Sequence, residues 1–365
     1  MSEINRKLAT IERIIGVASI PDADKICAYN VRGWWVVDQV GKYATGDLVI
    51  FVEIDAFIPT AMAPFLTKPG HFPKTYEGIE GERLRTVKLR GQVSQGLILP
   101  MSILAEYAVD YDEDGVQVWH GPEHFFSEGN DATELLGIVK YEPPVAACLA
   151  GVARGNFPSF GRKTDQERIE NCVYEVFEKH AGAEYEITLK MDGSSCSVYF
   201  NNDTAGVCSR NLELKIEEGN SENSFVATAT STGLLDALKA LKKNIMVSGE
   251  LMGPGIQDNK EKLTSFKLFV FDIFDIDAHK YMGTDERMAT VDALRQLGFT
   301  GDHVPIIKRK VTLKDVGIVD VASSKVFVDR PSLNAAVAEG CVFKRVDGEF
   351  SFKSINNKFL LKFKD

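Results

Sequence analysis

The first hundred residues of the chain consist of short apolar runs separated by turn residues. A β-branched run over 11–20 ends at the turn 21–24, a second run covers 29–40, and a third covers 48–54 after the turn at Gly46. Short strands at this spacing, with glycine in the turns, are typical of small β-barrels. The five-stranded OB type fits the length best, so we expect an N-terminal OB-type barrel.

A further strand is expected over 83–90, leading through Gly91 to the apolar segment 97–99. It would place four basic side chains on one strand, namely Arg83, Arg85, Lys88 and Arg90. Basic groups on a barrel that also carries aromatic residues suit a strand of nucleic acid. An ordinary solvated strand face explains the same pattern, and both interpretations stay open.

The pattern changes after Tyr141. Pro143, Pro144 and the Gly- and Phe-rich stretch 151–161 are typical of a linker. A helix is then expected from Thr164 or Asp165, and from there strands alternate with helices, the latter near 224–243 and 284–297. We therefore expect an α+β protein with a barrel over 1–145, a linker over 146–163 and a mixed α/β domain over 164–365.

The net charge of −10 does not exclude a nucleic-acid partner, because it is concentrated in one segment. Residues 105–135 contain nine acidic residues and no Lys or Arg, whereas the last 25 residues hold six basic residues against three acidic ones. Phosphate binding depends on the local field, not on the total charge. We interpret 105–135 as an acidic excursion from the barrel; Asp112, Glu113 and Asp114 lack the spacing of a calcium-binding loop.

The remaining composition indicates an intracellular, cytoplasmic protein. The six cysteines form no C-x-x-C pair and the six histidines show no zinc-ligand spacing. We find no apolar stretch near the roughly 18 residues of a membrane span, and no secretory signal at the N-terminus.

The sharpest local feature is Lys190-Met191-Asp192-Gly193, directly after an apolar strand expected over 185–189. A lysine at a strand end beside a glycine turn is presented to a cleft. It is a nucleophile only when neutral, so nearby cations or burial must lower its pKa from about 10.4. Taken alone, this four-residue pattern is more often an ordinary surface turn.

An ordered series of further motifs favours the nucleophilic lysine over the surface turn. Arg210 follows a short strand, Glu250 ends an apolar strand, and Phe271 lies in an aromatic strand. Two more segments come near the C-terminus, Glu339-Gly340-Cys341-Val342-Phe343-Lys344 and Phe352-Lys353-Ser354-Ile355-Asn356-Asn357-Lys358-Phe359. Six motifs in order make a far more specific pattern than any one of them.

The order of these motifs resembles the covalent nucleotidyltransferase superfamily, which contains ATP-dependent RNA and DNA ligases and mRNA capping enzymes. Within it the chain is most similar to RNA ligases of the nick-sealing branch with an N-terminal OB-fold domain. The resemblance covers essentially the whole chain. It implies an adenylyltransferase domain built on antiparallel sheets, with ATP and Mg²⁺ or Mn²⁺ as cofactors.

The resemblance also implies a role for each matched residue. Lys190 would attack the α-phosphorus of ATP and become lysyl-AMP. Arg210 and Lys353 would contact the nucleotide phosphate, and both would be catalytic as well as nucleotide-binding residues. Glu250 would accept hydrogen bonds from the ribose and Phe271 would stack on adenine. The metal-binding residues would be Asp192 and Glu339. This agrees with the needs of phosphoryl transfer, which are positioning and neutralised charge, and with the preference of Mg²⁺ for few carboxylates and several waters.

Each matched residue also has a plainer explanation. Glu250 fits an exposed strand end, Phe271 an ordinary core position, and Lys353 a solvated basic tail. Two positions depart from the family pattern: Ile355 stands where some RNA ligases have a second lysine, and Leu189 stands where a glutamate is frequent. Lys358 or Lys344 would then complete the phosphate clamp. Lys163 and Arg168, near the expected helix start, would reach a substrate phosphate.

We therefore expect an ATP-dependent RNA ligase that joins a 3′-OH to a 5′-phosphate. Its expected substrate is a nicked duplex. We expect it to act as a monomer and to have no membrane partner. Only twelve residues follow Lys353, which leaves no room for the C-terminal OB domain of DNA ligases and capping enzymes. A DNA ligase or guanylyltransferase is the first alternative. The second is a non-catalytic nucleic-acid-binding module with a degenerate transferase domain.

Overall fold

The computed structural model describes residues 7–111, 117–141, 151–217 and 222–363. The chain divides into two compact units, Met1–Pro144 and Val145–Asp365. The acidic residues Asp112 to Asp114 lie outside the described residues. Among the helices of the described part, none has the length and apolar character needed to cross a membrane.

The first unit is built on a curled five-stranded antiparallel sheet in the order β10-β4-β1-β2-β3. Its strands are β1 (Ala9–Ile20), β2 (Ala23–Val31), β3 (Trp34–Gln39), β4 (Leu48–Val52) and β10 (Leu97–Pro100). The edge strands β10 and β3 are in contact, and the Gln95 N–H just before β10 donates to the Trp35 carbonyl at 2.8 Å. The sheet therefore closes on itself, as expected of an OB-type barrel.

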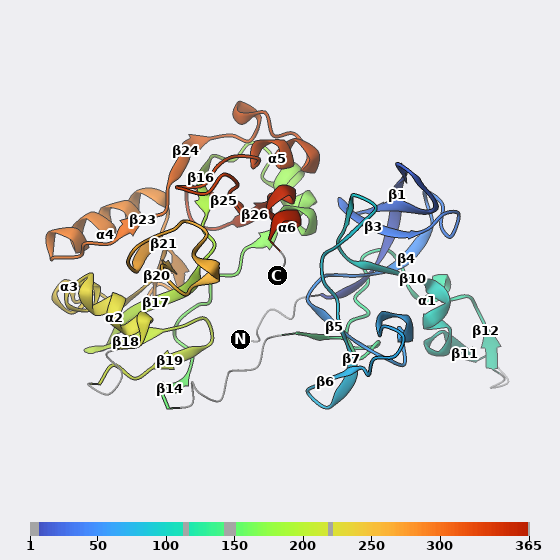
Figure 1. Ribbon diagram of the computed structural model, residues 1–365, viewed down its shortest axis with the longest axis horizontal. Coiled ribbons are helices and arrows are strands. Elements are labelled where there is room, and N and C mark those ends of the chain that lie inside the picture. Colours follow the sequence, from blue (N-terminus) through green and yellow to red (C-terminus); the bar gives the residue numbers. More distant parts are fainter. Residues whose placement is uncertain (1–6, 112–116, 142–150, 218–221, 364–365) are drawn as a thin grey trace. The chain divides into compact units, whose positions relative to one another are not determined.

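Shorter elements complete this unit (Figure 1). A second sheet runs in the order β13-β5-β7-β6, with bounds Val139–Lys140, Ala56–Pro59, Ile79–Arg83 and Lys74–Tyr76. Two hairpins are β8 (Val87–Leu89) with β9 (Gln92–Ser94) and β11 (Val109–Tyr111) with β12 (Gln117–Trp119). The helices are η1 (Pro64–Leu66), η2 (Met101–Tyr107) and α1 (Pro122–Phe125).

Two strand predictions in this unit are wrong in their extent. The run 29–40 is divided into β2 and β3 by a tight turn in which Arg32 and Gly33 both have positive φ, with the Asn30 side chain accepting from the Gly33 N–H at 3.1 Å. The run 83–90 is likewise split between β7 and β8. The four basic residues therefore do not share one strand, and Arg83 is held by an ion pair with Asp55 at 2.5 Å.

The second unit contains two sheets. The larger has the order β14-β19-β18-β17-β20-β21-β22, with β23 parallel to β21. Its bounds are Ala153–Asn156, Leu212–Leu214, Thr204–Cys208, Ser194–Asn201, Ile245–Met252, Lys267–Asp275, Lys280–Tyr281 and, for β23, Asp302–His303. The smaller has the order β15-β26-β25-β16-β24, with bounds Glu167–Arg168, Ser351–Ile355, Gly340–Arg345, Tyr185–Lys190 and Ile306–Val311.

Helices cover each sheet of this unit. Buried side chains of α2 (Ser224–Ser231), α3 (Leu234–Leu241) and α4 (Thr284–Gln296) share one apolar core with β17, β18, β20 and β21 of the larger sheet (Figure 1). A second core lies on the smaller sheet and includes Tyr185, Phe343 and Phe352. The remaining helical elements are α5 (Val321–Phe327), α6 (Asn357–Lys362), η4 (Ile169–Asn171), η5 (Glu175–Lys179), η7 (Gln257–Asn259) and η8 (Lys314–Val316).

The α+β class and the antiparallel sheets are confirmed, whereas three local predictions in this unit need correction. The helix expected near 224–243 is broken at Gly233, whose φ of +73° and close approach to the Gly298 carbonyl both exclude a side chain. The helix expected from Thr164 is replaced by β15, η4 and the π-helix η5, because residues 167–168 pair with β26. Residues 153–156, within the expected linker, form a strand that pairs with β19.

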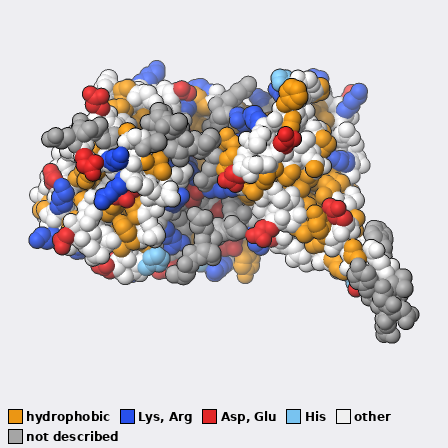
Figure 2. All heavy atoms as spheres, turned by 90° about the horizontal axis from the view of Figure 1, so that it is seen from below, with side chains coloured by type: hydrophobic (Ala, Val, Ile, Leu, Met, Phe, Trp, Pro, Cys, Tyr) orange, Lys and Arg blue, Asp and Glu red, His pale blue; other side chains and the backbone are white. Residues whose placement is uncertain are grey.

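Charge is mixed over the surface. On the face drawn in Figure 2, the described acidic and basic side chains are interspersed. On this face, charge alone therefore marks no phosphate-binding site.

Candidate active site

Strand pairing in the smaller sheet places Lys190 beside Glu339. Lys190 is the last residue of β16, and its register partner on β25 is Gly340. Glu339 directly precedes β25, so its side chain comes next to Lys190 although 149 residues separate the two. The Lys190 Nζ atom donates to Glu339 Oε2 at 2.7 Å. This ion pair is the centre of the site.

Glu250 reaches the same place from the larger sheet. It lies on β20, opposite Ser195 of β17, and its Oε1 atom accepts a hydrogen bond from the Gly193 N–H at 2.9 Å. A Cβ atom on Gly193 would lie 2.4 Å from the Leu251 carbonyl oxygen and 3.0 Å from Glu250 Cγ. Glycine after Asp192 is therefore required for the backbone to approach Glu250 so closely.

Asp192 has a partner that the sequence patterns did not indicate. The Lys260 Nζ atom lies 2.6 Å from Asp192 Oδ2 and also donates to the Gln257 carbonyl at 3.1 Å. The ammonium group faces the rings of Phe359 and Phe363, at 5.6 and 5.0 Å from their centroids. Lys260 is therefore held between a carboxylate and two aromatic faces.

Three carboxylates act on Lys190 together. Burial opposes its charged form, but Glu339, Glu250 and Asp192 outweigh burial and raise the pKa of Lys190 above its ordinary value. Burial also raises the pKa of Glu250, to about 7, although the charge of Lys190 acts in the opposite direction. In this state Lys190 is an ammonium ion, and a nucleophilic role would require that the carboxylates be drawn away from it.

Lys353 brings a second cation close to Lys190. It lies on β26, with Val342 and Arg168 as its strand partners. Burial and then the charge of Lys190 lower its pKa to about 8, and the charges of Asp165, Arg168 and Glu339 act on it as well. A phosphate placed here would restore the charged form of Lys353, because it supplies the missing counter-charge.

Phe271 belongs to the apolar wall of the site. It packs, partly buried, against a cluster that contains Leu189 and Met191, the neighbours of Lys190 in sequence. The Lys344 Nζ atom lies 5.4 Å from the Phe271 ring centroid and 2.7 Å from Asp272 Oδ2. Burial lowers the pKa of Lys344 to about 8 despite this ion pair. Lys344 thus fixes the strand that carries Phe271.

Arg210 is placed differently from the other predicted site residues. Its side chain is 60 % exposed, and its guanidinium pairs with Asp165 at 3.1 Å. Within the described part of the chain, no hydrogen bond or ion pair joins Arg210 to Lys190. Asp165 is one of the charges that act on Lys353, so Arg210 lies at the edge of the cluster and its predicted role stays a prediction.

The predicted site residues thus fall into two sets. The structure brings together Lys190, Asp192, Glu250, Glu339 and Lys353, with Phe271 on the adjacent apolar wall. A pocket lies at this point and is lined by Lys190, Asp192, Met252, Lys260, Glu261, Ser332, Ala335, Val337, Glu339 and Phe359. Lys260 is the functional candidate that the sequence analysis missed; its only sequence signal is a cation ten residues after Glu250 in the following loop.

The donor set suits a hard divalent cation and a phosphate. Asp192 and Glu339 offer carboxylate oxygens, the ligands that Mg²⁺ and Mn²⁺ prefer. Lys190, Lys260 and Lys353 offer the positive charge that a nucleotide phosphate requires. The carboxylates of Asp192 and Glu339 now pair with the ammonium groups of Lys260 and Lys190. If these ammonium groups paired with a nucleotide phosphate instead, both carboxylates could bind a divalent cation.

Comparisons with known proteins point in the same direction. A family model for an OB-fold domain matches residues 8–101, and one described as RNA ligase matches residues 183–364. Comparison with curated proteins gives no match.

Solved structures of a Naegleria gruberi RNA ligase resemble the whole chain. A mutant of that ligase with AMP and Mn matches with a TM-score of 0.83 and 39% identity, over 99% of this chain and 100% of the other. A mutant with ATP and Mn gives a TM-score of 0.82 at 39% identity over 99% and 100% of the two chains, and a complex with PPi gives 0.81 at 39% over 99% of each. The chain therefore belongs to the RNA ligase family.

Proposed function

We propose that this protein is an RNA ligase that uses ATP and a divalent cation to join a 3′-OH to a 5′-phosphate through a lysyl-AMP intermediate. The observation that carries the proposal is the Lys190–Glu339 ion pair, set among the carboxylates of Asp192 and Glu250 and the cation of Lys353. The similar Naegleria ligase structures contain ATP or AMP with Mn, which supports the same pair of cofactors here.

Lys190 performs the first step. As the neutral amine, its Nζ atom forms a bond to the α-phosphorus of ATP while the bond to pyrophosphate breaks, and the proton of the ammonium form leaves beforehand. A divalent cation held by Asp192 and Glu339 would supply neutralising charge at the α-phosphate and draw these carboxylates away from Lys190. Lys353 and Arg210 hold the phosphates, Glu250 the ribose, and Phe271 the adenine.

The two later steps act on the RNA and use the same residues. AMP passes from Lys190 to the 5′-phosphate of the RNA, and the 3′-OH then attacks that phosphate and releases AMP. We infer that the region 1–145 is an OB-fold domain that holds the duplex through its phosphates, and that 164–365 is the transferase domain. The substrate class within this proposal is a nick in a duplex, sealed by a monomer.

The first test is adenylylation of the protein with ATP labelled at the α-phosphate. Wild type with Mg²⁺ is expected to carry label through a denaturing gel, whereas Lys190→Ala and Lys190→Arg carry none. Lys262→Met, a change at an exposed lysine of the same unit, is the matched control and keeps the label. Folded wild-type protein that is free of AMP and takes no label from ATP would overturn the proposal.

The second test is substrate choice. Matched 5′-phosphorylated substrates are compared: a nick with RNA on the 3′-OH side, a nick with DNA on that side, and single-stranded RNA. Faster sealing of the RNA nick supports the proposed substrate. Equal rates on all three substrates, or sealing of single strands alone, would refute the nick assignment while leaving the lysyl-AMP chemistry intact.

A further inference from the structure

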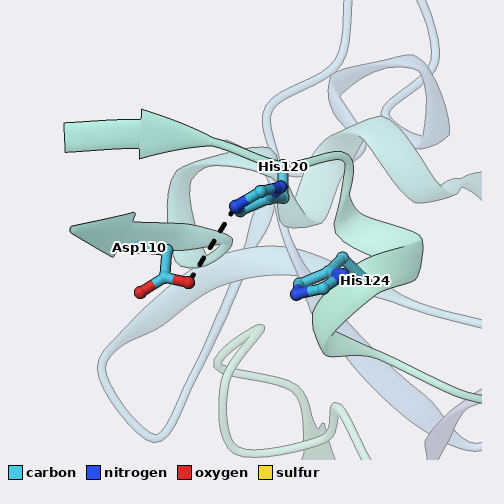
Figure 3. Close-up of side chains that lie close together, drawn as sticks. All are labelled: Asp110, His120 and His124. Carbon is cyan, nitrogen blue, oxygen red and sulfur yellow. Dashed lines mark ion pairs between the residues drawn. The ribbon is translucent and has the colours of Figure 1, made fainter. Parts of the chain in front are cut away.

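The first unit contains a cluster of three potential metal ligands. Asp110 lies on β11, His120 directly follows β12, and His124 lies on α1. One donor atom from each residue lies within 4.8 Å of the other two. Figure 3 shows the Asp110 carboxylate on the same side as one ring nitrogen of each histidine. From the sequence we noted no zinc-ligand spacing among the histidines; three residues separate His120 from His124.

Local structure brings the three side chains together. The antiparallel pairing of β11 and β12, with Asp110 opposite Val118, places Asp110 near the end of β12. The Gly121–Pro122 turn begins α1, and the His124 N–H donates to the Gly121 carbonyl at 2.9 Å. The two imidazole rings lie face to face, with centroids 4.6 Å apart and an angle of 27° between their planes.

The spacing of the donor atoms differs from that of a simple hydrogen-bonded pair. His120 Nε2 lies 4.0 Å from Asp110 Oδ2, whereas a direct hydrogen bond between these atoms would be about 2.9 Å long. Ligand atoms of a tetrahedral zinc ion lie about 3.4 Å apart, given bonds of about 2.0 to 2.1 Å. The side chains of His120 and Asp110 are 41% and 52% exposed. Rotation of their χ angles can therefore shorten the distance between Nε2 and Oδ2.

The geometry points to a binding site for a zinc-type divalent transition metal ion formed by Asp110, His120 and His124. Two imidazoles and one carboxylate are ligands that such ions prefer, with water in the fourth position, whereas Mg²⁺ prefers oxygen donors alone. This site is therefore chemically distinct from the carboxylate set around Lys190. A bound ion would link the β11–β12 hairpin to α1.

Cobalt titration of the full chain, prepared without a histidine tag, tests this inference. Co²⁺ in a tetrahedral site gives strong visible absorption, so wild type should show these bands saturating at one equivalent, and Zn²⁺ should abolish them. His120→Gln and His124→Gln should each weaken Co²⁺ binding at least tenfold. His71→Gln, at an exposed histidine of the same unit outside the cluster, should bind as wild type does.

Two further results decide the outcome. Asp192→Asn should keep the cobalt bands, because the carboxylates around Lys190 are not part of this site. His124→Gln should keep Mg²⁺-dependent adenylylation within twofold of wild type, and its circular dichroism should match. Absence of the bands in wild type, or equal Co²⁺ affinity in wild type and His124→Gln, would overturn the inference without affecting the proposed ligase activity.

Discussion

Lys190 and Glu339 form an ion pair, with 2.7 Å between Nζ and Oε2. The pair joins the end of β16 to the residue before β25, and it favours the charged form of Lys190, in which an amine is not nucleophilic. Any ligand that draws the Glu339 carboxylate away from Lys190 should therefore lower the pKa of Lys190. This coupling predicts how the reactivity of Lys190 responds to substitutions around it.

Neutralising Glu339 should lower the pKa of Lys190. Glu339→Gln keeps the size of the side chain but removes the nearest of the carboxylates that raise this pKa, while burial still disfavours the ammonium. Competitive acetylation of Lys190, followed by mass spectrometry over a pH series, measures the change without depending on activity. The reactive fraction should appear at lower pH than in wild type. Asp236→Asn, at an exposed pair on α3, should leave the profile unchanged; an unshifted profile in Glu339→Gln would contradict this explanation.

Gly193→Ala should weaken nucleotide binding while the fold persists. The new Cβ would meet the Leu251 carbonyl oxygen at 2.4 Å, so β17 and β20 must separate and the Gly193 N–H loses Glu250. We expect the affinity for ATP to fall about tenfold or more, or about 1.4 kcal/mol of binding free energy. Gly182→Ala, where an added Cβ has open space, is the matched control. Calorimetry that shows equal affinities for both variants would refute the role assigned to this close approach.

Lys353 should make phosphate binding depend on pH. Burial and the charge of Lys190 lower the pKa of Lys353 to about 8. The free protein therefore loses the positive charge of Lys353 as the pH rises from about 7 to 9. An arginine retains its charge over this range. Binding of α,β-methylene ATP, which cannot adenylylate Lys190, should therefore weaken about tenfold more in wild type than in Lys353→Arg between pH 7.5 and 9.5. Parallel pH profiles for the two proteins would show that Lys353 does not contact the phosphates.

The sequence identified the chemistry of the site better than its geometry. The segment from Lys190 to Gly193 could be recognised as a strand end followed by a glycine turn, because those features are local. The pairing that brings Glu339 to Lys190 spans 149 residues and depends on the register of β16 against β25. From the sequence we expected a strand over 185–189 but named none over 340–345, and local patterns do not fix the register or the partners of a strand.

The elements that were missed have two physical causes. The hairpin at Arg32 and the turn at Gln257 to Asn259 both use non-glycine residues with positive φ, which sequence patterns do not indicate. The second of these turns brings Lys260 back to Asp192. The π-helix η5 was likewise expected to be a regular helix, because its apolar spacing alone does not reveal the strand pairing of residues 167–168 before it.

Lys260 should compete with a divalent cation for Asp192. Its ammonium lies 2.6 Å from Asp192 Oδ2, where it opposes any further positive charge. Lys260→Met keeps an unbranched apolar chain against Phe359 and Phe363 but removes the charge. In the absence of nucleotide, Mn²⁺ should bind this variant about tenfold more tightly than wild type, because the carboxylate no longer has to release an ammonium ion.

Electron paramagnetic resonance of free Mn²⁺ measures this affinity directly, with no contribution from catalysis. Lys262→Met is the matched control, since Lys262 is exposed two residues away and should leave Mn²⁺ binding unchanged. Adding Asp192→Asn to Lys260→Met should abolish the gain, because the freed carboxylate is its cause. Equal or weaker Mn²⁺ binding by Lys260→Met would mean that Lys260 positions Asp192 for the metal instead of competing with it.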